Sequence, residues 1–257
     1  MNRTRKGIRL IPLYSRNIEP TDLCANTGQQ YLRRLTHTLI HLGERCLACG
    51  TRSASGLCRD CFRDLPWNDH PCRCCAIPLE TPGDLCGHCA LHPPGYDRAY
   101  AAFEYAWPIA PMLQAFKFHG HLAVGRTLAL AFSEYLVMRA ARRPDILVPV
   151  PLHPRRLSER GFNQAIEIAR PLARSLGITI RYHSLIRRRH TPAQSGLGAA
   201  ARRRNLSGAF ACKCRFNGLH VALVDDVITT GSTAEALAAT LKQAGARHVS
   251  VYALARA

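Results

Sequence analysis

The segment 221–233, VALVDDVITTGST, combines two adjacent acids with a turn rich in hydroxyl side chains and glycine. Its first four residues form a short apolar run typical of a buried parallel strand, and the Ala- and Leu-rich segment 234–244 predicts a helix that ends at Gly245. Carboxylates at a strand end can accept hydrogen bonds from sugar hydroxyls, and main-chain N–H groups at a helix start can hold phosphate oxygens. The segment therefore predicts a phosphoribose ligand.

Within this segment, Asp225 and Asp226 are the expected partners of the ribose hydroxyls. The residues expected to wrap the 5′-phosphate are Thr229, Thr230, Gly231, Ser232 and Thr233. The alternative is that Ser232 with Glu235 is an ordinary capping box, which would explain the serine but not two adjacent acids. Since open α/β sheets bind ligands where strands end and helices begin, we expect the site at the carboxyl edge of a parallel sheet.

A second basic segment follows DILVPV, residues 145–150, which is another predicted buried strand. Arg155, Arg156 and Arg160 lie in a loop just past this strand and before a helix predicted to start near residue 162. Guanidinium groups at such a place can bind pyrophosphate oxygens through paired hydrogen bonds. The alternative is that the three arginines are solvated charges flanking the helix.

Positive charge is concentrated in the second half of the chain. The chain has 35 Lys and Arg residues against 17 Asp and Glu, and the stretch 168–224 holds eleven Lys or Arg residues and no acid. Such a stretch attracts phosphates, whereas an ordinary solvated face mixes charges of both signs. Its part 187–205, with Gly, Ser and Pro between basic ends, predicts a cationic flap that closes over a charged ligand and excludes water.

Eight of the twelve cysteines form four Cys-x-x-Cys pairs before residue 90. Two such pairs in succession can supply the four thiolates of a closed tetrahedral site, and in a cytosolic chain this clustering favours metal over disulfides. We therefore expect structural Zn²⁺, one or two ions, in small ribbons. The predicted ligands are Cys46, Cys49, Cys58 and Cys61 for the first site and Cys72, Cys75, Cys86 and Cys89 for the second.

Other residues could compete for these sites. Cys74 lies between two predicted ligands of the second site, and the spacing favours its neighbours. With four thiolates available for each ion, the nearby histidines are expected at the surface; they are His70, His88 and His92. The cysteines without suitable spacing are predicted to be free thiols; they are Cys24, Cys212 and Cys214.

Three parts of the chain are predicted. Residues 1–43 form a basic N-terminal extension with a helix over 29–42, residues 44–95 a double zinc-ribbon module, and residues 96–257 an α/β domain. A chain of 257 residues is long enough for one full α/β domain and a smaller module. Between the cysteine module and the predicted strand 145–150, we expect a strand over 97–105 and helices over 108–118 and 122–142.

Neither a signal peptide nor a membrane span is expected. The N-terminal segment is basic but has no sustained apolar run, and nowhere do eighteen apolar residues follow one another. The expected location is the cytoplasm, with no insertion into a membrane.

Taken in order, these motifs resemble the ComF/GntX family, whose members carry competence protein F type names. The resemblance rests on the double Cys-x-x-Cys region, LVPVPLHPRRL with RGFNQA, TPAQSGL with RRRN, and VALVDDVITTGST, and it covers about residues 44–257. It implies a zinc ribbon ahead of a type I phosphoribosyltransferase domain, a parallel sheet flanked by helices. The last motif is similar to the phosphoribosyl-pyrophosphate (PRPP) signature of that class.

The resemblance also implies roles for residues. The acid pair and the following turn would bind PRPP, the loop from Arg155 to Arg160 would bind its pyrophosphate, and segment 187–205 would be the flap. The family-like positions of this flap are Thr191, Gln194, Arg203 and Asn205. Mg²⁺ would bridge the ribose hydroxyls and the pyrophosphate, and catalysis would consist mainly of positioning and charge neutralisation.

Two functions follow from this reading. The first is an enzyme that transfers phosphoribose from PRPP to an unknown acceptor, with the role in DNA uptake and natural transformation that the resemblance implies. The second is a PRPP sensor without catalysis, whose zinc module and basic face bind single-stranded DNA or competence and DNA-uptake proteins. The acid pair and the arginines favour the enzyme, although they would also serve binding alone. Aromatic residues are only 7% of the chain, which weakens the case for a base-stacking surface.

Overall fold

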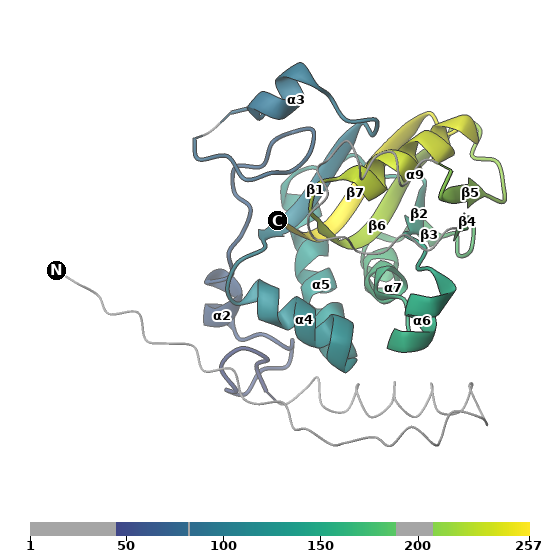
Figure 1. The fold of residues 1–257 in the computed structure, drawn as a ribbon. Helices are drawn as coiled ribbons and strands as arrows, with labels where there is room; N and C mark the ends of the chain where they lie inside the picture. The colour runs from purple at the N-terminus through teal and green to yellow at the C-terminus, as the bar shows by residue number, and fades with distance from the viewer. Residues whose placement is uncertain (1–44, 82, 189–207) are drawn as a thin grey trace, which may run out of the picture.

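The computed structural model describes residues 45–81, 83–188 and 208–257. A parallel sheet lies at the centre, with helices on both faces and the cysteine-rich module at one edge (Figure 1). In the described residues the strand order is β1-β7-β6-β2-β3, all neighbours being parallel. The strands are β1 Arg98–Glu104, β2 Ile146–Pro149, β3 Thr179–Ile180, β6 His220–Ile228 and β7 His248–Arg256. The predicted class, an α/β fold with a flanked parallel sheet behind a cysteine-rich module, is confirmed.

The two central strands, β6 and β7, are long and largely apolar because both of their faces are covered. They pair from His220 opposite His248 to Ile228 opposite Arg256. Val221, Leu223 and Val224 have no exposed surface. This buried pair holds the turn that follows β6 in a fixed position.

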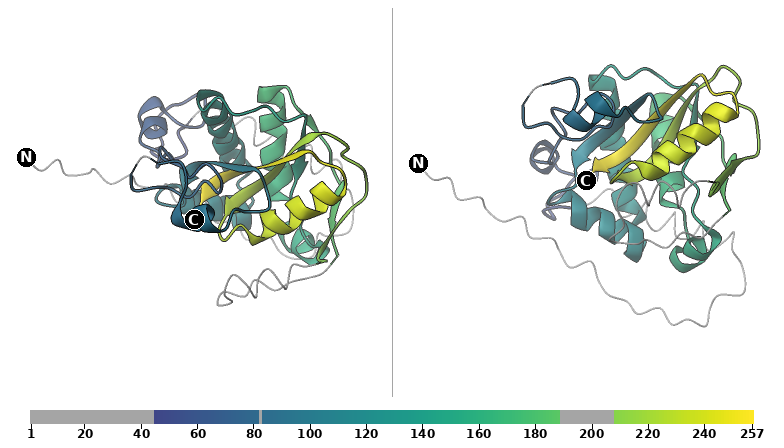
Figure 2. Two further views of the ribbon diagram at one scale, coloured as in Figure 1. Left: turned by 90° about the horizontal axis from the view of Figure 1, so that it is seen from above. Right: turned by 45° about the horizontal axis from the view of Figure 1, so that its top comes forward.

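Helices cover the sheet on both sides, as the turned views show (Figure 2). Three of them, α4 Ile109–His119, α5 Leu122–Met138 and α7 Gln164–Leu176, pack with one face of the sheet in a shared apolar core. The opposite face is covered by α9 Ser232–Gln243, whose Leu237 and Leu241 are fully buried. In the described ranges, no helix combines the length and the apolar character needed to cross a bilayer.

A short antiparallel hairpin, β4 Leu185–Arg187 with β5 Phe210–Cys212, lies beside α9. The segment between these strands, 189–207, lies outside the described residues. Several predictions therefore concern residues that the structure does not describe. They are the flap positions Thr191, Gln194, Arg203 and Asn205, the N-terminal extension with its predicted helix, and Cys24.

The cysteine-rich module contains two short helices, α2 Arg59–Arg63 and α3 Gly87–Leu91, and continues the sheet beyond β1. The N–H of Asn68 donates to Ala102 O at 2.8 Å, and the N–H of Glu104 donates to Pro66 O at 2.9 Å. Trp67 packs on Phe103, with ring centroids 4.8 Å apart. The module is thus bonded along the outer side of β1.

Most predicted elements occur where the sequence placed them. The expected strands 97–105 and 145–150 correspond to β1 and β2, and the expected helices 108–118, 122–142 and 234–244 correspond to α4, α5 and α9. The predicted helix near residue 162 is α7, which Asn163 caps by accepting from the N–H of Ala165.

Two expectations need correction. The strand predicted to end at the acid pair continues past it to Ile228, because β7 still pairs with β6 there. The arginine segment predicted as a loop contains a two-turn helix, α6 Pro154–Arg160. This helix begins with Pro154 as its first residue and ends at Gly161 in the left-handed conformation, with φ of 75°.

Candidate functional site

Asp225 and Asp226 lie where β6 loses one of its two neighbours. The N–H of Val150 donates to Val224 O at 2.9 Å, and the parallel register of β2 with β6 ends at this point. The next residue, Pro151, has no N–H with which to extend the ladder. The acids therefore have a strand on one side only, and as successive strand residues they point toward opposite faces of the sheet.

Asp226 is held by a lysine from the helical layer. Lys117 Nζ, at the carboxyl end of α4, lies 3.1 Å from Asp226 Oδ2, and the two side chains are only 20% and 11% exposed. Sequence reasoning missed Lys117, because a single lysine at the end of an apolar helix carries no motif. Its ammonium balances the charge of one member of the acid pair.

Asp225 faces the turn between β6 and α9. Burial, and next the charge of Asp226, raise the pKa of Asp225 to about 7. The N–H of Asp226, which donates to Asp225 Oδ1 at 2.9 Å, opposes this shift only in part. This carboxyl group therefore titrates near neutral pH, and a nearby cation would favour its ionised form.

The residues 229–233, called here the phosphate turn, enclose a small hollow of about 50 Å³ beside Asp225. That volume is several times what one water molecule needs. An α-helix leaves its first N–H groups without a partner inside the helix. Here the N–H of Ser232 donates to Thr230 Oγ1 at 3.5 Å, and Ser232, Thr233 and Ala234 all line the hollow. The turn thus presents main-chain donors next to a carboxylate.

Gly231 gives the turn its shape. Its φ is +78°, and a β-carbon at this position would stand 3.3 Å from the hydroxyl oxygen of Tyr96. Gly231 is also the N-cap of α9, and its carbonyl accepts from the N–H of Glu235 at 2.9 Å. The capping-box alternative for Ser232 is therefore wrong: Ser232 is the first helical residue, and its Oγ lies 3.0 Å from Thr230 Oγ1.

The three arginines predicted to bind pyrophosphate lie on two sides of α6. Arg155 is exposed, and its Nε lies 3.1 Å from Glu159 Oε1. Arg156 and Arg160, one helical turn apart, share another side and are half-buried. Burial lowers the pKa of Arg160, while the charges of Asp226 and Asp225 act in the opposite direction. Arg160 therefore lies within electrostatic reach of the acid pair.

Arg187, at the end of β4, belongs to the same charged cluster. Burial and the charge of Arg156 lower its pKa, and Asp225 acts in the opposite direction. Its guanidinium lies 5.5 Å from the ring centre of Phe210. In the sequence, Arg187 is predicted only as the first residue of the flap. Together with Lys117 and Arg160 it places positive charge around two carboxylates, an arrangement suited to a ligand that carries both hydroxyls and phosphates.

The eight predicted thiolates form two groups of four, and the Sγ atoms of each group lie within 4.8 Å of one another. Cys49 Sγ and Cys58 Sγ are 3.7 Å apart, and Cys75 Sγ and Cys86 Sγ are 3.8 Å apart. A tetrahedral ion with Zn–S bonds of about 2.3 Å requires sulfur atoms separated by about 3.8 Å. Both groups therefore fit a structural Zn²⁺ ion.

The two groups have the same local construction. Cys58 is the N-cap of α2 and accepts from the N–H of Cys61, and Cys86 is the N-cap of α3 and accepts from the N–H of Cys89, each at 3.4 Å. Cys74 stands outside the second group, as predicted from spacing. Among the described residues neither group includes a histidine, and Cys74, Cys212 and Cys214 belong to neither group and form no disulfide.

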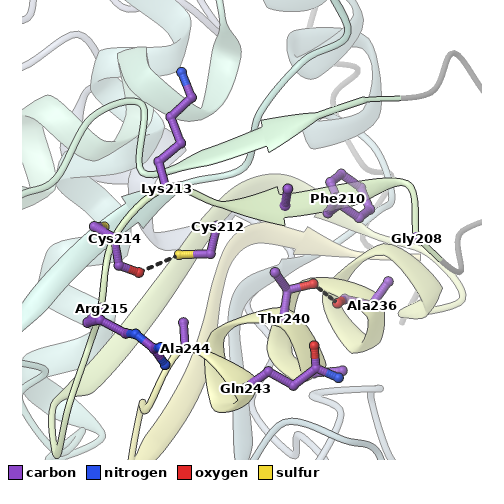
Figure 3. Close-up of a pocket in the computed structure, with 12 residues that line it drawn as sticks. Gly208, Phe210, Cys212, Lys213, Cys214, Arg215, Ala236, Thr240, Gln243 and Ala244 are labelled. Atoms are coloured by element: carbon purple, nitrogen blue, oxygen red, sulfur yellow. Dashed lines mark hydrogen bonds between the residues drawn. The ribbon is translucent and has the colours of Figure 1, made fainter.

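A larger hollow of about 610 Å³ lies apart from the acids, between β5 and α9 (Figure 3). Lys213 and Arg215 stand on one side of it, and Thr240 and Gln243 of α9 on the other. Cys212 Sγ donates to Cys214 O at 2.9 Å there. None of the acids or phosphate-turn residues lines this hollow, so its size alone does not mark the site.

Comparisons with known proteins agree with this organisation. A family model described as "Double zinc ribbon domain" matches residues 40–90. The "Competence protein F" of Haemophilus influenzae is 36% identical over 228 residues, which cover 83% of this chain and 97% of that protein. The "DNA utilization protein YhgH" of Salmonella typhimurium is 36% identical over 205 residues, which cover 78% of this chain and 90% of that protein. These two relatives thus match this chain along most of its length, across both the cysteine-rich module and the parallel sheet. The chain belongs to the competence protein F family, the ComF/GntX family.

Solved structures of phosphoribosyltransferases also resemble part of the chain. The glutamine PRPP amidotransferase from B. subtilis is 23% identical, with a TM-score of 0.35, and the match covers 51% of this chain and 26% of that one. A purine phosphoribosyltransferase from Pyrococcus horikoshii is 16% identical, with a TM-score of 0.34, and the match covers 52% of this chain and 82% of that one. With TM-scores this low, the family assignment rests on the sequence relatives.

Proposed function

We propose that this protein binds PRPP at the carboxyl end of β6 and transfers its phosphoribosyl group to an acceptor, with release of pyrophosphate. One observation carries the proposal. Asp225 faces the hollow of the phosphate turn, while cationic side chains from three other elements lie around the acid pair. A sugar phosphate with a second phosphate group is the ligand class that uses all of these groups at once.

Each part of the site then has a role. Asp225 and Asp226 accept hydrogen bonds from the ribose hydroxyls, and the 5′-phosphate accepts them from the N–H and hydroxyl groups of the phosphate turn. On the half-buried side of α6, Arg156 and Arg160 neutralise the pyrophosphate, whereas Arg155 pairs with Glu159 on the exposed side. As the bond between C1 of the ribose and the pyrophosphate oxygen breaks, pyrophosphate leaves with the electron pair, and a nucleophilic atom of the acceptor bonds to C1. Fixed positive charge next to the leaving group lowers the barrier of this step.

Mg²⁺ is the metal that would accompany PRPP. The carboxylate oxygens of Asp225 and Asp226 are the donor type that Mg²⁺ prefers. Burial and the charge of Asp226 raise the pKa of Asp225, and a bound cation would favour its ionised form. When bound, the ion would neutralise charge on the pyrophosphate. The flap positions Thr191, Gln194, Arg203 and Asn205 would close over the ligand and exclude water.

The names of the relatives support a biological setting. In line with the names "Competence protein F" and "DNA utilization protein", the proposal places the phosphoribosyl chemistry in the uptake or use of DNA. The competing function is a PRPP-sensing protein that binds single-stranded DNA or DNA-uptake proteins without turnover. Its basis is the strongly basic chain, which would favour nucleic acid through its phosphates.

The test is pyrophosphate release from PRPP with Mg²⁺, measured with a panel of nucleobases, ammonia and nucleic acids as acceptors. Release that depends on an acceptor and is lost in the Asp225→Asn, Asp226→Asn double variant would support the enzyme. The matched control is Asp97→Asn, which changes a part-buried acid at the opposite end of the sheet, where it accepts from the N–H of Val249. PRPP binding without release would favour the sensor, and no calorimetric heat with PRPP would reject both.

A further inference from the structure

A buried arginine joins the second cysteine group to the phosphate turn. Arg256, the last residue of β7, is 8% exposed. Its Nε donates to the carbonyl of Cys75 at 3.0 Å, and its Nη1 donates to the carbonyl of Ile228 at 3.2 Å. The same Nη1 also contacts the carbonyl of Thr229 and the backbone oxygen of Ala257. One guanidinium thus contacts a predicted zinc ligand and the first residue of the phosphate turn.

The contacted carbonyl belongs to the first Cys-x-x-Cys turn of the second cysteine group, Cys72 to Cys75, called here the second knuckle; the equivalent turn of the first group, Cys46 to Cys49, is the first knuckle. Ala76 follows Cys75 with φ of 58°, a conformation that costs a non-glycine residue energy, and its N–H donates to Cys72 O at 2.8 Å. The carbonyl of Ala76 accepts from Asn68 Nδ2 at 2.8 Å, and Asn68 is fully buried. Two successive carbonyls of this knuckle are therefore held by buried side-chain donors, one of which is Arg256.

The first knuckle has the same turn but a different attachment. Gly50 takes the place of Ala76: its φ is 77°, and its N–H donates to Cys46 O at 2.9 Å. The carbonyl of Gly50 accepts from the guanidinium of Arg45, a residue of the same module, at 3.2 Å. The two cysteine groups therefore form an internal comparison, since among the described contacts only the second group is joined by a side chain to the phosphate turn.

We propose that Arg256 is a positioning residue that makes the phosphate turn depend on metal in the second cysteine group. The inference rests on the proposed function, because the turn is taken as the seat of the 5′-phosphate. With Zn²⁺ bound, the Cys75 carbonyl is fixed and orients the guanidinium, which in turn fixes the carbonyls of Ile228 and Thr229. Without the metal, the knuckle loosens and Arg256 loses a partner that a buried charge needs. The main-chain donors of the turn are then no longer held in place for a phosphate.

The experiment compares two cysteine variants and two arginine variants in the full chain. Cys86→Ser removes a ligand of the second group, and Cys58→Ser removes the equivalent N-cap ligand of the first; both residues are half-buried. Arg256→Lys keeps the charge but loses the planar fork. Its control is Arg139→Lys, because Arg139 also donates to module carbonyls, those of Asn68 and Asp69, but joins them to α5.

Three quantities are measured for each variant: zinc content, hydrogen exchange of the amides at 229–233, and the dissociation constant for PRPP by calorimetry. We expect Cys86→Ser and Arg256→Lys to increase exchange in the phosphate turn and to weaken PRPP binding by about tenfold or more. Cys58→Ser and Arg139→Lys should leave exchange in the turn and PRPP affinity near the wild-type values.

Equal effects of Cys58→Ser and Cys86→Ser on the turn would overturn the proposal, as would wild-type exchange in Arg256→Lys. If Cys86→Ser does not fold, the comparison of Arg256→Lys with Arg139→Lys is enough to decide whether Arg256 positions the phosphate turn. If the wild-type protein does not bind PRPP, the proposed function fails, and the exchange measurements still decide whether Arg256 couples the metal group to the turn.

Discussion

Lys117 Nζ and Asp226 Oδ2 form a largely buried ion pair, 3.1 Å apart, between the end of α4 and the carboxyl half of β6. This ion pair joins the helical layer to β6. The other acid, Asp225, faces the hollow of the phosphate turn. Since each partner is largely shielded from water, removing one leaves a charge with poor solvation.

The first prediction concerns this pair. Lys117→Met should lower the free energy of unfolding by about 1–3 kcal/mol, because it leaves a shielded carboxylate unpaired. The double variant Lys117→Met, Asp226→Asn should recover much of that loss but not PRPP binding. Urea denaturation and calorimetry give the two readings. Lys242→Met, which breaks the more exposed pair with Asp97, should cost less than about 1 kcal/mol; an equal cost would contradict the role of burial.

The second prediction concerns pH and stability. The pKa of Asp225 is raised in the folded protein to about 7 from an ordinary value of 3.8, so between these values the folded state holds a proton that the unfolded state releases. This contribution to stability is complete below about pH 4 and is lost as pH rises to about 7. Asp225→Asn should therefore be more stable than the wild type at pH 8, by on the order of 2 kcal/mol. Parallel stability profiles for the two proteins between pH 4 and 8 would contradict this.

A third prediction applies to ligand binding at the same carboxyl group. Mg²⁺ and PRPP need the ionised form of Asp225, so PRPP affinity measured with Mg²⁺ should fall as pH decreases below about 7. Calorimetry at pH 6, 7 and 8 measures this dependence. The Asp225→Asn variant should bind weakly at every pH, and a wild-type affinity that does not change across this range would count against the role of Asp225.

The fourth prediction concerns Gly231. Gly231→Ala places a β-carbon at a φ of +78° and 3.3 Å from the Tyr96 hydroxyl oxygen, so it should cost about 1–3 kcal/mol and abolish PRPP binding. The control is Gly218→Ala, with a φ of +73° and open space around the new β-carbon. Gly218→Ala should lower the free energy of unfolding only through its unfavourable φ, and it should bind PRPP normally. Thermal unfolding and calorimetry would distinguish the two, and equal binding by both would reject the predicted role of the turn.

The fifth prediction concerns the arginines of α6. Arg160→Ala should weaken PRPP binding more strongly than Arg155→Ala, because Arg160 is half-buried within reach of the acids whereas Arg155 is exposed beside Glu159. We expect at least about tenfold for Arg160→Ala and a few-fold at most for Arg155→Ala. The ordering is checked by titration at low and at physiological salt, and a reversed order would show that the exposed side of α6 binds the pyrophosphate.

The metal groups were the most predictable part of the molecule. A Cys-x-x-Cys spacing fixes the geometry of two thiolates through a few backbone angles, and each partner pair lies close in the chain, so local sequence determines the ligand set. The same reasoning excluded Cys74 from the second group. The α/β class also followed from local patterns, since apolar runs and helical periodicity depend on near neighbours.

The site was only partly predictable because its charge comes from distant elements. The packing of α4 brings Lys117 to Asp226, and the β4–β5 hairpin brings Arg187 within electrostatic reach of Asp225; neither residue stands in a motif. The continuation of β6 to Ile228 depends on its pairing with β7, a non-local contact. The α6 helix, in contrast, had signals that could have been used, namely Pro154 at its start and Gly161 at its end.

The pairing of residues 66–68 with β1 has a consequence for where this protein can be cut. A truncated chain that begins at residue 96 would retain the predicted α/β domain but would uncover the N–H and C=O groups of β1 and the ring of Phe103, which Trp67 covers. A bare outermost strand invites pairing with other chains, and aggregation follows. We therefore expect a chain cut at the predicted boundary between module and domain to be less soluble than the full chain.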